Sequence, residues 1–183
     1  MTREEAIKRL IKTAKDEIGY LEKGGPYTLY EKKMSAGGKN YTKYNYEMNR
    51  IEPEVMDYPA HWCDAFVDWC FMDTFGIDLA RKMLGGFDDY TPYSFQKFID
   101  NDAWHQNPEV GDQIFFQNAE GKICHTGIVI KVTFDTVYTI EGNTKSSNDE
   151  PFPNDGCVRE KAYRIDDKKI AGYGRPKYEL VVD

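Results

Sequence analysis

The hydrophobic pattern of this chain changes at Gly111, and the change limits the possible folds more than any other feature does. Before Gly111, apolar residues recur every three or four positions, which is typical of helices that bury one face. After it, short apolar runs and alternating stretches are separated by turn residues, which is typical of strands. Helices followed by successive strands predict an α+β domain, with an antiparallel β-sheet packed against N-terminal helices.

The first part of the chain is expected to form three helices, over residues 2–21, 63–75 and 92–100. In the first helix, Thr2 and Glu5 form a capping-box pair, and Gly24-Gly25-Pro26 marks the stop. Residues 26–61 have weak periodicity and many tyrosines, so we expect a long and partly irregular segment there. Segments of this kind inside a compact domain often carry function.

The second part is expected to form a meander of strands over residues 113–117, 125–132 and 136–141, with further edge strands over residues 157–163 and 170–178. A turn at Phe134-Asp135 would join the second strand to the third. The chain contains no internal repeat, low-complexity tract or linker, so residues 1–183 are expected to form a single catalytic domain.

The charge balance disfavours several classes of partner. Asp and Glu outnumber Lys and Arg by 31 to 24, which argues against binding to nucleic acid or docking onto an anionic membrane. No apolar run approaches the roughly 18 residues of a membrane span, and residues 1–10 carry charge where a signal peptide would be apolar. We therefore expect synthesis without a signal peptide and retention in the cytoplasm until release by another route. We also expect a monomer.

Among four cysteines, Cys63 has the most favourable position for nucleophilic chemistry. In a reducing compartment all four are expected to be thiols, and the absence of a C-x-x-C pair argues against a zinc site. Cys63 begins a predicted helix, where the helix dipole stabilises the thiolate, which is the reactive form. Alternatively, Cys63 is a small buried hydrophobic residue, which is our interpretation of Cys70.

His125 is the candidate base among three histidines, because it opens a predicted strand and a thiol nucleophile needs an imidazole. The hairpin would bring His125 close to Glu141 and Asn143. A carboxylate or an amide that orients the base is the third element of a catalytic triad. The opposite face of the strand is expected to carry Ile128, Ile130 and Val132. The alternative is an ordinary strand end with a solvated histidine and glutamate.

Residues near the nucleophile are expected to form the substrate-binding cleft, namely Tyr58, His61, Trp62 and Asp64, with the tyrosine-rich stretch 27–46. His61 lies too close to Cys63 along the chain to act as its base, and plain solvent exposure is the alternative to a place in the cleft. The aspartates do not follow the pattern of a calcium loop, and no glycine-rich phosphate loop occurs. Neither a metal nor a cofactor is therefore expected.

Four blocks of the sequence, in this order, resemble the CHAP domain, the cysteine, histidine-dependent amidohydrolase/peptidase family. They are W-C-D-A-F-V at 62–67, V-G-D-Q-I-F-F at 110–116, H-T-G-I-V at 125–129 and Y-T-I-E-G-N-T at 138–144. The ending G-Y-G-R-P-K-Y at 172–178 is similar to the last strand of phage-type members. The resemblance covers roughly residues 5–178.

The resemblance implies a papain-like α+β fold and the cleavage of bacterial peptidoglycan, commonly by phage endolysins or wall-remodelling enzymes. Through the motif positions it implies Cys63 as nucleophile, His125 as base and Glu141 as the residue that orients the imidazole. Asn143 matches a further polar position of the family's site, and is expected to hold the histidine or to help bind the oxyanion.

Several interpretations stay open. Some CHAP domains bind calcium before the cysteine, but here that stretch offers only Glu52, Glu54 and Asp57, without the family's spacing. The bond cut could join sugar to peptide, as for an N-acetylmuramoyl-L-alanine amidase, or lie within the peptide, as for an endopeptidase. A non-catalytic cell-wall-binding module and an interbacterial amidase toxin are the alternatives to a phage endolysin catalytic domain.

Overall fold

The computed structural model describes residues 1–145 and 156–182. Its helices are α1 (Arg3–Asp16), α2 (Lys43–Ile51), α3 (Cys63–Phe75), α4 (Ile77–Leu84), α5 (Thr91–Asp100) and the short 3-10 helix η1 (Tyr178–Leu180). Its strands are β1 (Trp104–His105), β2 (Gln113–Gln117), β3 (Ile123–Val132), β4 (Thr136–Thr144), β5 (Cys157–Arg164) and β6 (Ile170–Gly174). Among the described residues, no helix combines the length and the apolar character that crossing a membrane requires.

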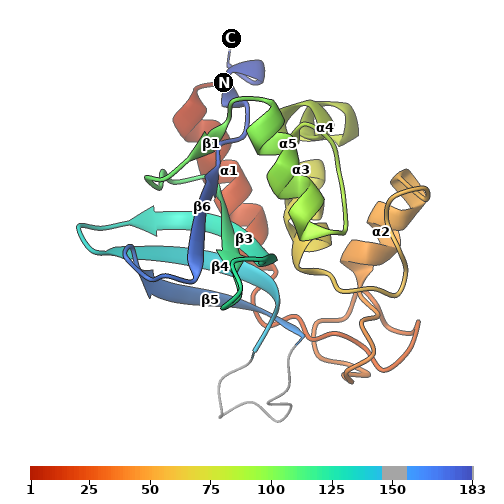
Figure 1. Ribbon diagram of the computed structural model, residues 1–183. Helices are drawn as coiled ribbons and strands as arrows, with labels where there is room; N and C mark the ends of the chain where they lie inside the picture. The colour runs from red at the N-terminus through yellow and green to blue at the C-terminus, as the bar shows by residue number, and fades with distance from the viewer. Residues whose placement is uncertain (146–155, 183) are drawn as a thin grey trace.

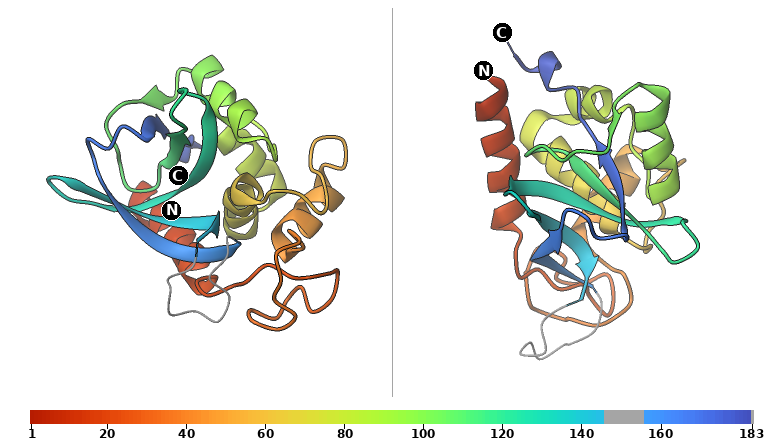
Figure 2. Two further views of the ribbon diagram at one scale, coloured as in Figure 1. Left: turned by 60° about the horizontal axis from the view of Figure 1, so that its bottom comes forward. Right: turned by 60° about the vertical axis from the view of Figure 1, so that its left-hand side comes forward.

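The strands form one antiparallel sheet in the order β1-β6-β2-β3-β4-β5. Figures 1 and 2 show α2, α3, α4 and α5 together on one side of this sheet. Helix α3 packs against both β3 and β4, and all its residues from Cys63 to Phe71 are buried. The predicted α+β class, with the sheet packed against N-terminal helices in the manner of a papain-like fold, is confirmed.

Several predicted elements agree closely with the structure. The bounds of α3 and β2 are those predicted, α5 begins one residue before the predicted start, and the turn after Val132 joins β3 to β4. The predicted end of the first helix is wrong. The capping box of Thr2 and Glu5 is present, but α1 stops at Asp16. Gly19 then turns the chain with a positive φ, and Leu21 pairs with Cys157 at the start of β5.

The sequence analysis missed α2, α4 and β1, which lack strong local signals. Helix α2 lies inside the stretch expected to be partly irregular, and it is held by a capping box of Thr42 and Asn45 and a buried face that includes Tyr44 and Met48. Helix α4 follows α3 directly after Gly76. Strand β6 ends at Gly174, and it lies inside the sheet, so the prediction of an edge strand to 178 was wrong.

One bulge changes the predicted faces of β3. The pairing with β4 shifts register between Val129 and Lys131, which places two consecutive residues opposite one and reverses the alternation beyond that point. Ile128 and Ile130 therefore pack toward the helices, whereas Val132 packs with Val129 on the other face of the sheet. The expectation that Val132 shares the face of Ile128 is wrong for this reason.

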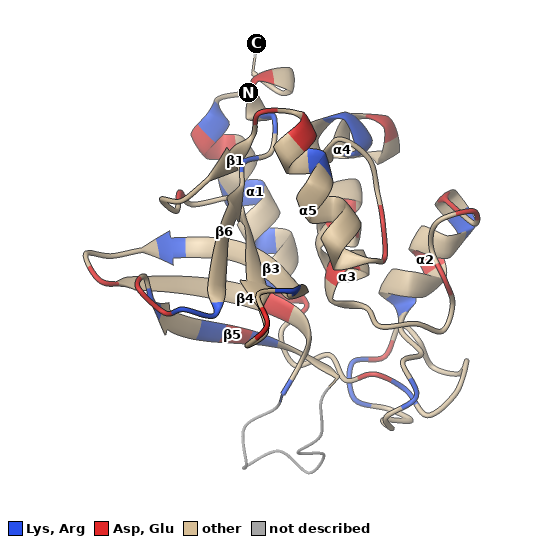
Figure 3. Cartoon of the chain, in the orientation of Figure 1, with Lys and Arg blue, Asp and Glu red and all other residues tan. Residues whose placement is uncertain are grey.

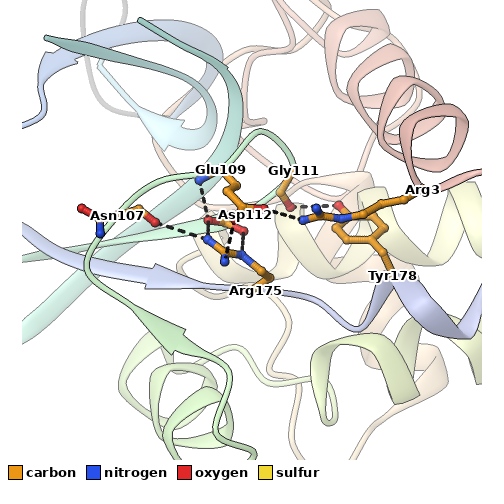
Figure 4. A network of polar contacts seen from close by, with 7 residues as sticks. All are labelled: Arg3, Asn107, Glu109, Gly111, Asp112, Arg175 and Tyr178. Atoms are coloured by element: carbon orange, nitrogen blue, oxygen red, sulfur yellow. Dashed lines mark hydrogen bonds and ion pairs between the residues drawn. The ribbon is translucent and has the colours of Figure 1, made fainter. Parts of the chain in front are cut away.

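A buried ion pair ties the C-terminal strand to the rest of the sheet (Figure 4). Asp112 is fully buried and accepts two hydrogen bonds from Arg175, each 3.0 Å long. Arg175 also pairs with Glu109 at 2.8 Å, and Glu109 pairs with Arg3 of α1 at 2.7 Å. The Tyr178 hydroxyl donates to the Gly111 carbonyl at 2.8 Å. Two of the recognised sequence blocks, 110–116 and 172–178, thus meet in a structural clamp.

Replacement of Arg175 should test the clamp. Arg175→Met keeps an unbranched apolar side chain in place of the arginine stem but leaves the buried Asp112 carboxylate without its cation, so we expect a loss of about 3 kcal/mol in the free energy of unfolding. Urea denaturation measures it. The control is Arg164→Met in the exposed pair with Asp166, which should cost less than about 1 kcal/mol. Equal small losses in both variants would contradict the assignment.

Candidate active site

Cys63 lies at the first turn of α3, with 6% of its surface exposed. The first hydrogen bond of the helix runs from the Phe66 amide to the Trp62 carbonyl. The amides of Cys63, Asp64 and Ala65 therefore have no intrahelical acceptor, and their partial positive charge lies around the thiol. This position favours the thiolate, which is the reactive form of cysteine.

His125 and Glu141 face each other on neighbouring strands. The Nε2 atom of His125 lies 2.9 Å from Oε2 of Glu141. The Glu141 side chain is fully buried, and it also accepts hydrogen bonds from the Thr139 hydroxyl at 2.6 Å and the Tyr163 hydroxyl at 3.2 Å. Three donors thus hold one carboxylate, which fixes the direction of the imidazole ring. The ring lies beside Phe116, with the centroids 5.6 Å apart.

The His125 ring interacts with Cys63 as well as with Glu141. Burial alone lowers the pKa of His125, but hydrogen bonds and charge interactions with Cys63 and Glu141 outweigh it and raise the pKa to about 10. Because Nε2 is bonded to Glu141, the ring presents Nδ1 to the thiol. The arrangement therefore favours an imidazolium between a sulfur and a carboxylate at neutral pH, which is suited to donating a proton to a leaving group.

The predicted register places Asn143 close to His125, but in the structure Asn143 contacts His61. Its Nδ2 atom lies 3.3 Å from Nδ1 of His61, and its backbone has a positive φ of 51°. The pairing of β4 with β5 shifts between Glu141 and Thr144, so the simple alternation of faces ends just after Glu141. Asn143 and His61 consequently form a separate polar pair, and His61 is exposed.

Of the four residues predicted to contact the substrate, two are buried and one is half-buried. Trp62 and Asp64 have fully buried side chains: the Trp62 indole donates to Glu22 at 2.9 Å, and Asp64 accepts from Gln113 at 2.9 Å. Neither side chain is exposed, so neither is placed to contact a substrate directly. Tyr58 is half-buried between Tyr41 and Tyr46.

The structure adds residues that the sequence analysis did not single out. Around Cys63, His125 and Glu141 lie Thr91, Gln113, Thr126, Thr139 and Tyr163. The Thr91 hydroxyl, at the start of α5, is 3.5 Å from the Cys63 sulfur. Only one local signal was available, because Thr139 lies two residues before Glu141 and shares its strand face. The other contacts join segments far apart in the chain.

Over residues 1–145 and 156–182, no group of three or more His, Cys, Asp or Glu side chains is arranged to bind a metal ion. Of the carboxylates before the nucleophile, Glu52 pairs with Arg81 at 2.7 Å. The Asp57 amide donates to the Asp89 carboxylate at 2.6 Å.

Comparison with known proteins agrees with this geometry. No curated protein and no solved structure matches the chain. The family model of the CHAP domain, however, matches residues 54–143. The matched region contains Cys63, His125, Glu141 and Asn143, whereas α1, α2, β5 and β6 lie outside it. CHAP domains are cysteine- and histidine-dependent amidases and peptidases of peptidoglycan, and with residues 54–143 this chain belongs to that family.

Proposed function

We propose that this protein hydrolyses an amide bond of bacterial peptidoglycan with Cys63 as nucleophile, His125 as general acid and base, and Glu141 as the residue that orients the imidazole. The observation that carries the proposal is the His125 ring, which interacts with the Cys63 thiol and the buried Glu141 carboxylate together. A solvated histidine at an ordinary strand end would have neither partner.

The reaction follows from this geometry. The Cys63 thiolate attacks the amide carbonyl carbon, and the carbonyl oxygen takes up the negative charge. The backbone amide of Cys63, free at the start of α3, is suited to donate to that oxygen. The imidazolium of His125 gives its Nδ1 proton to the leaving nitrogen as the C–N bond breaks, which leaves a thioester. The neutral imidazole then takes a proton from water, and the hydroxide adds to the thioester carbonyl. The acid is released, and the proton held by His125 restores the imidazolium–thiolate pair.

The biological setting is part of the same proposal. The chain acts as the catalytic domain of a phage endolysin, as a monomer that reaches the peptidoglycan after release from the cytoplasm. The acidic surface supports a partner other than nucleic acid or membrane. The same catalytic residues serve an N-acetylmuramoyl-L-alanine amidase and an endopeptidase. Mass spectrometry of the fragments released from purified walls distinguishes the two, since an amidase leaves intact stem peptides without muramic acid.

Removal of the nucleophile should abolish lysis. Cys63→Ala lacks the attacking sulfur, so we expect no reduction in the turbidity of purified cell walls while the thermal unfolding temperature stays near that of the wild type. Cys124→Ser is the matched control, because Cys124 is an exposed free thiol on β3, and it should lyse walls normally. Lysis by Cys63→Ala at the wild-type rate would refute the proposed function, and a binding module would then be favoured.

The pH dependence should report the interaction between His125 and Glu141. Activity needs the imidazolium as acid, so it should fall as the pH rises toward about 10, the raised pKa of His125. Glu141→Gln removes the negative charge that favours the imidazolium, so the alkaline limb should move to lower pH and turnover should fall by about 10²-fold. Measurement of kcat/KM against pH on solubilised wall fragments tests both. An unchanged alkaline limb in the variant would contradict the role of Glu141.

A further inference from the structure

The residues next to the nucleophile and next to the base are joined by a buried chain of hydrogen bonds. Asp64 follows Cys63 on α3, and Thr126 follows His125 on β3. Between them lies Gln113 of β2, whose Nε2 atom is 2.9 Å from Oδ1 of Asp64 and 3.0 Å from Oγ1 of Thr126. The path therefore runs from the helix that carries the thiol to the strand that carries the imidazole.

The donors and acceptors along this path are determined by their chemistry. The Thr126 hydroxyl donates its single proton to the Ile114 carbonyl at 2.7 Å, so its oxygen must accept from Gln113. Gln113 consequently presents its amide NH2 group to Thr126. The second N–H of that group points at Asp64, whose Oδ1 atom must act as an acceptor. Each hydrogen bond in the path thus requires the next one.

Burial makes the path costly to break. Asp64 and Thr126 are fully buried, and Gln113 is 1% exposed. Without water to replace a lost partner, removal of one group leaves another polar atom unsatisfied. Surface residues could not fix the spacing of two elements in this way, because solvent would compete for every hydrogen bond. Neither Asp64 nor Thr126 is exposed to substrate, so the path can act on the reactive groups through the backbone that it shares with Cys63 and His125.

From this geometry we infer that Asp64, Gln113 and Thr126 are positioning residues, which set the distance between the Cys63 sulfur and the His125 ring. This inference rests on the proposed roles of Cys63 and His125. The bridge requires an acceptor at position 64 and a hydroxyl at position 126, whereas a negative charge at position 64 is not needed. A misplacement of catalytic groups by about 1 Å costs on the order of 10²-fold in rate.

Two substitutions of Asp64 separate the bridge from the charge. Asp64→Asn keeps a side-chain oxygen for Gln113 and places an amide NH2 near Ser94, whose buried hydroxyl has no hydrogen-bond partner among the described residues. Asp64→Ala removes the acceptor. We expect kcat for wall fragments to fall about 10²-fold in Asp64→Ala with KM little changed, and Asp64→Asn to restore most of it. Equal losses in the two variants would overturn the inference.

A second pair keeps the test valid if Asp64→Ala fails to fold. Thr126→Val removes the hydroxyl at almost constant volume, and Thr126→Ser retains it. Thr133→Val is the matched control, because the Thr133 hydroxyl also donates to a backbone carbonyl, that of Thr136 at 3.1 Å, at the far end of the same hairpin. Thr126→Val should lower kcat strongly, while Thr126→Ser and Thr133→Val should not. Wild-type turnover in folded Thr126→Val would refute the bridge.

Alkylation of Cys63 by iodoacetamide gives a readout that is independent of peptidoglycan. In the wild type the imidazolium keeps the thiolate reactive at pH 6, whereas a displaced ring should slow the reaction at pH 6 by about tenfold relative to pH 8. Mass spectrometry of the Cys63 peptide follows the rate. The slowing is expected in Asp64→Ala and Thr126→Val, and a wild-type pH profile in both would overturn the inference. If the wild type alkylates as expected but cleaves no wall, the proposed function fails and the bridge stands.

Discussion

The burial of α3 is the constraint on which the rest of the structure depends. From Cys63 to Phe71 every residue of this helix is buried, and only its last turn, where Asp73 is exposed, reaches the surface. The Cys63 thiol therefore lies at the N-terminal end of a buried helix, where the helix dipole acts on it. The sheet brings His125 and Glu141 toward it along β3 and β4, which pack against α3.

Polar groups inside this core are paired around the site instead of being excluded from it. Glu141 is fully buried with three hydrogen-bond donors, so its orientation is fixed more firmly than that of a surface carboxylate. Figure 3 shows charged residues along the length of α1 and β5 as well as in the connecting loops. Asp112, just before β2, and Arg175, just after β6, form another buried pair of this kind.

The family match covers only part of the residues that surround the candidate site in the structure. The match spans residues 54–143, which include Cys63, His125 and Glu141. Yet the Glu141 carboxylate also needs Tyr163 of β5, and the indole of Trp62 needs Glu22. Segments outside the matched region thus complete the environment of the candidate site.

Local pattern was sufficient for the elements with strong periodicity and for the contact between His125 and Glu141. The bounds of α3 and β2 and the proximity of His125 to Glu141 followed from the spacing of apolar residues and from antiparallel pairing. Short elements such as α4 and β1 could not be predicted in this way, because they contain too few residues to show a clear periodicity. The shifted place of Asn143, the burial of Trp62 and Asp64, and the bridge through Gln113 depend on bulges and on contacts between distant segments. A one-residue bulge reverses the direction of the side chains that follow it. The apolar pattern of a single strand does not show where a bulge occurs in its pairing with a neighbour. The tertiary structure alone therefore decides which side chains meet at these positions.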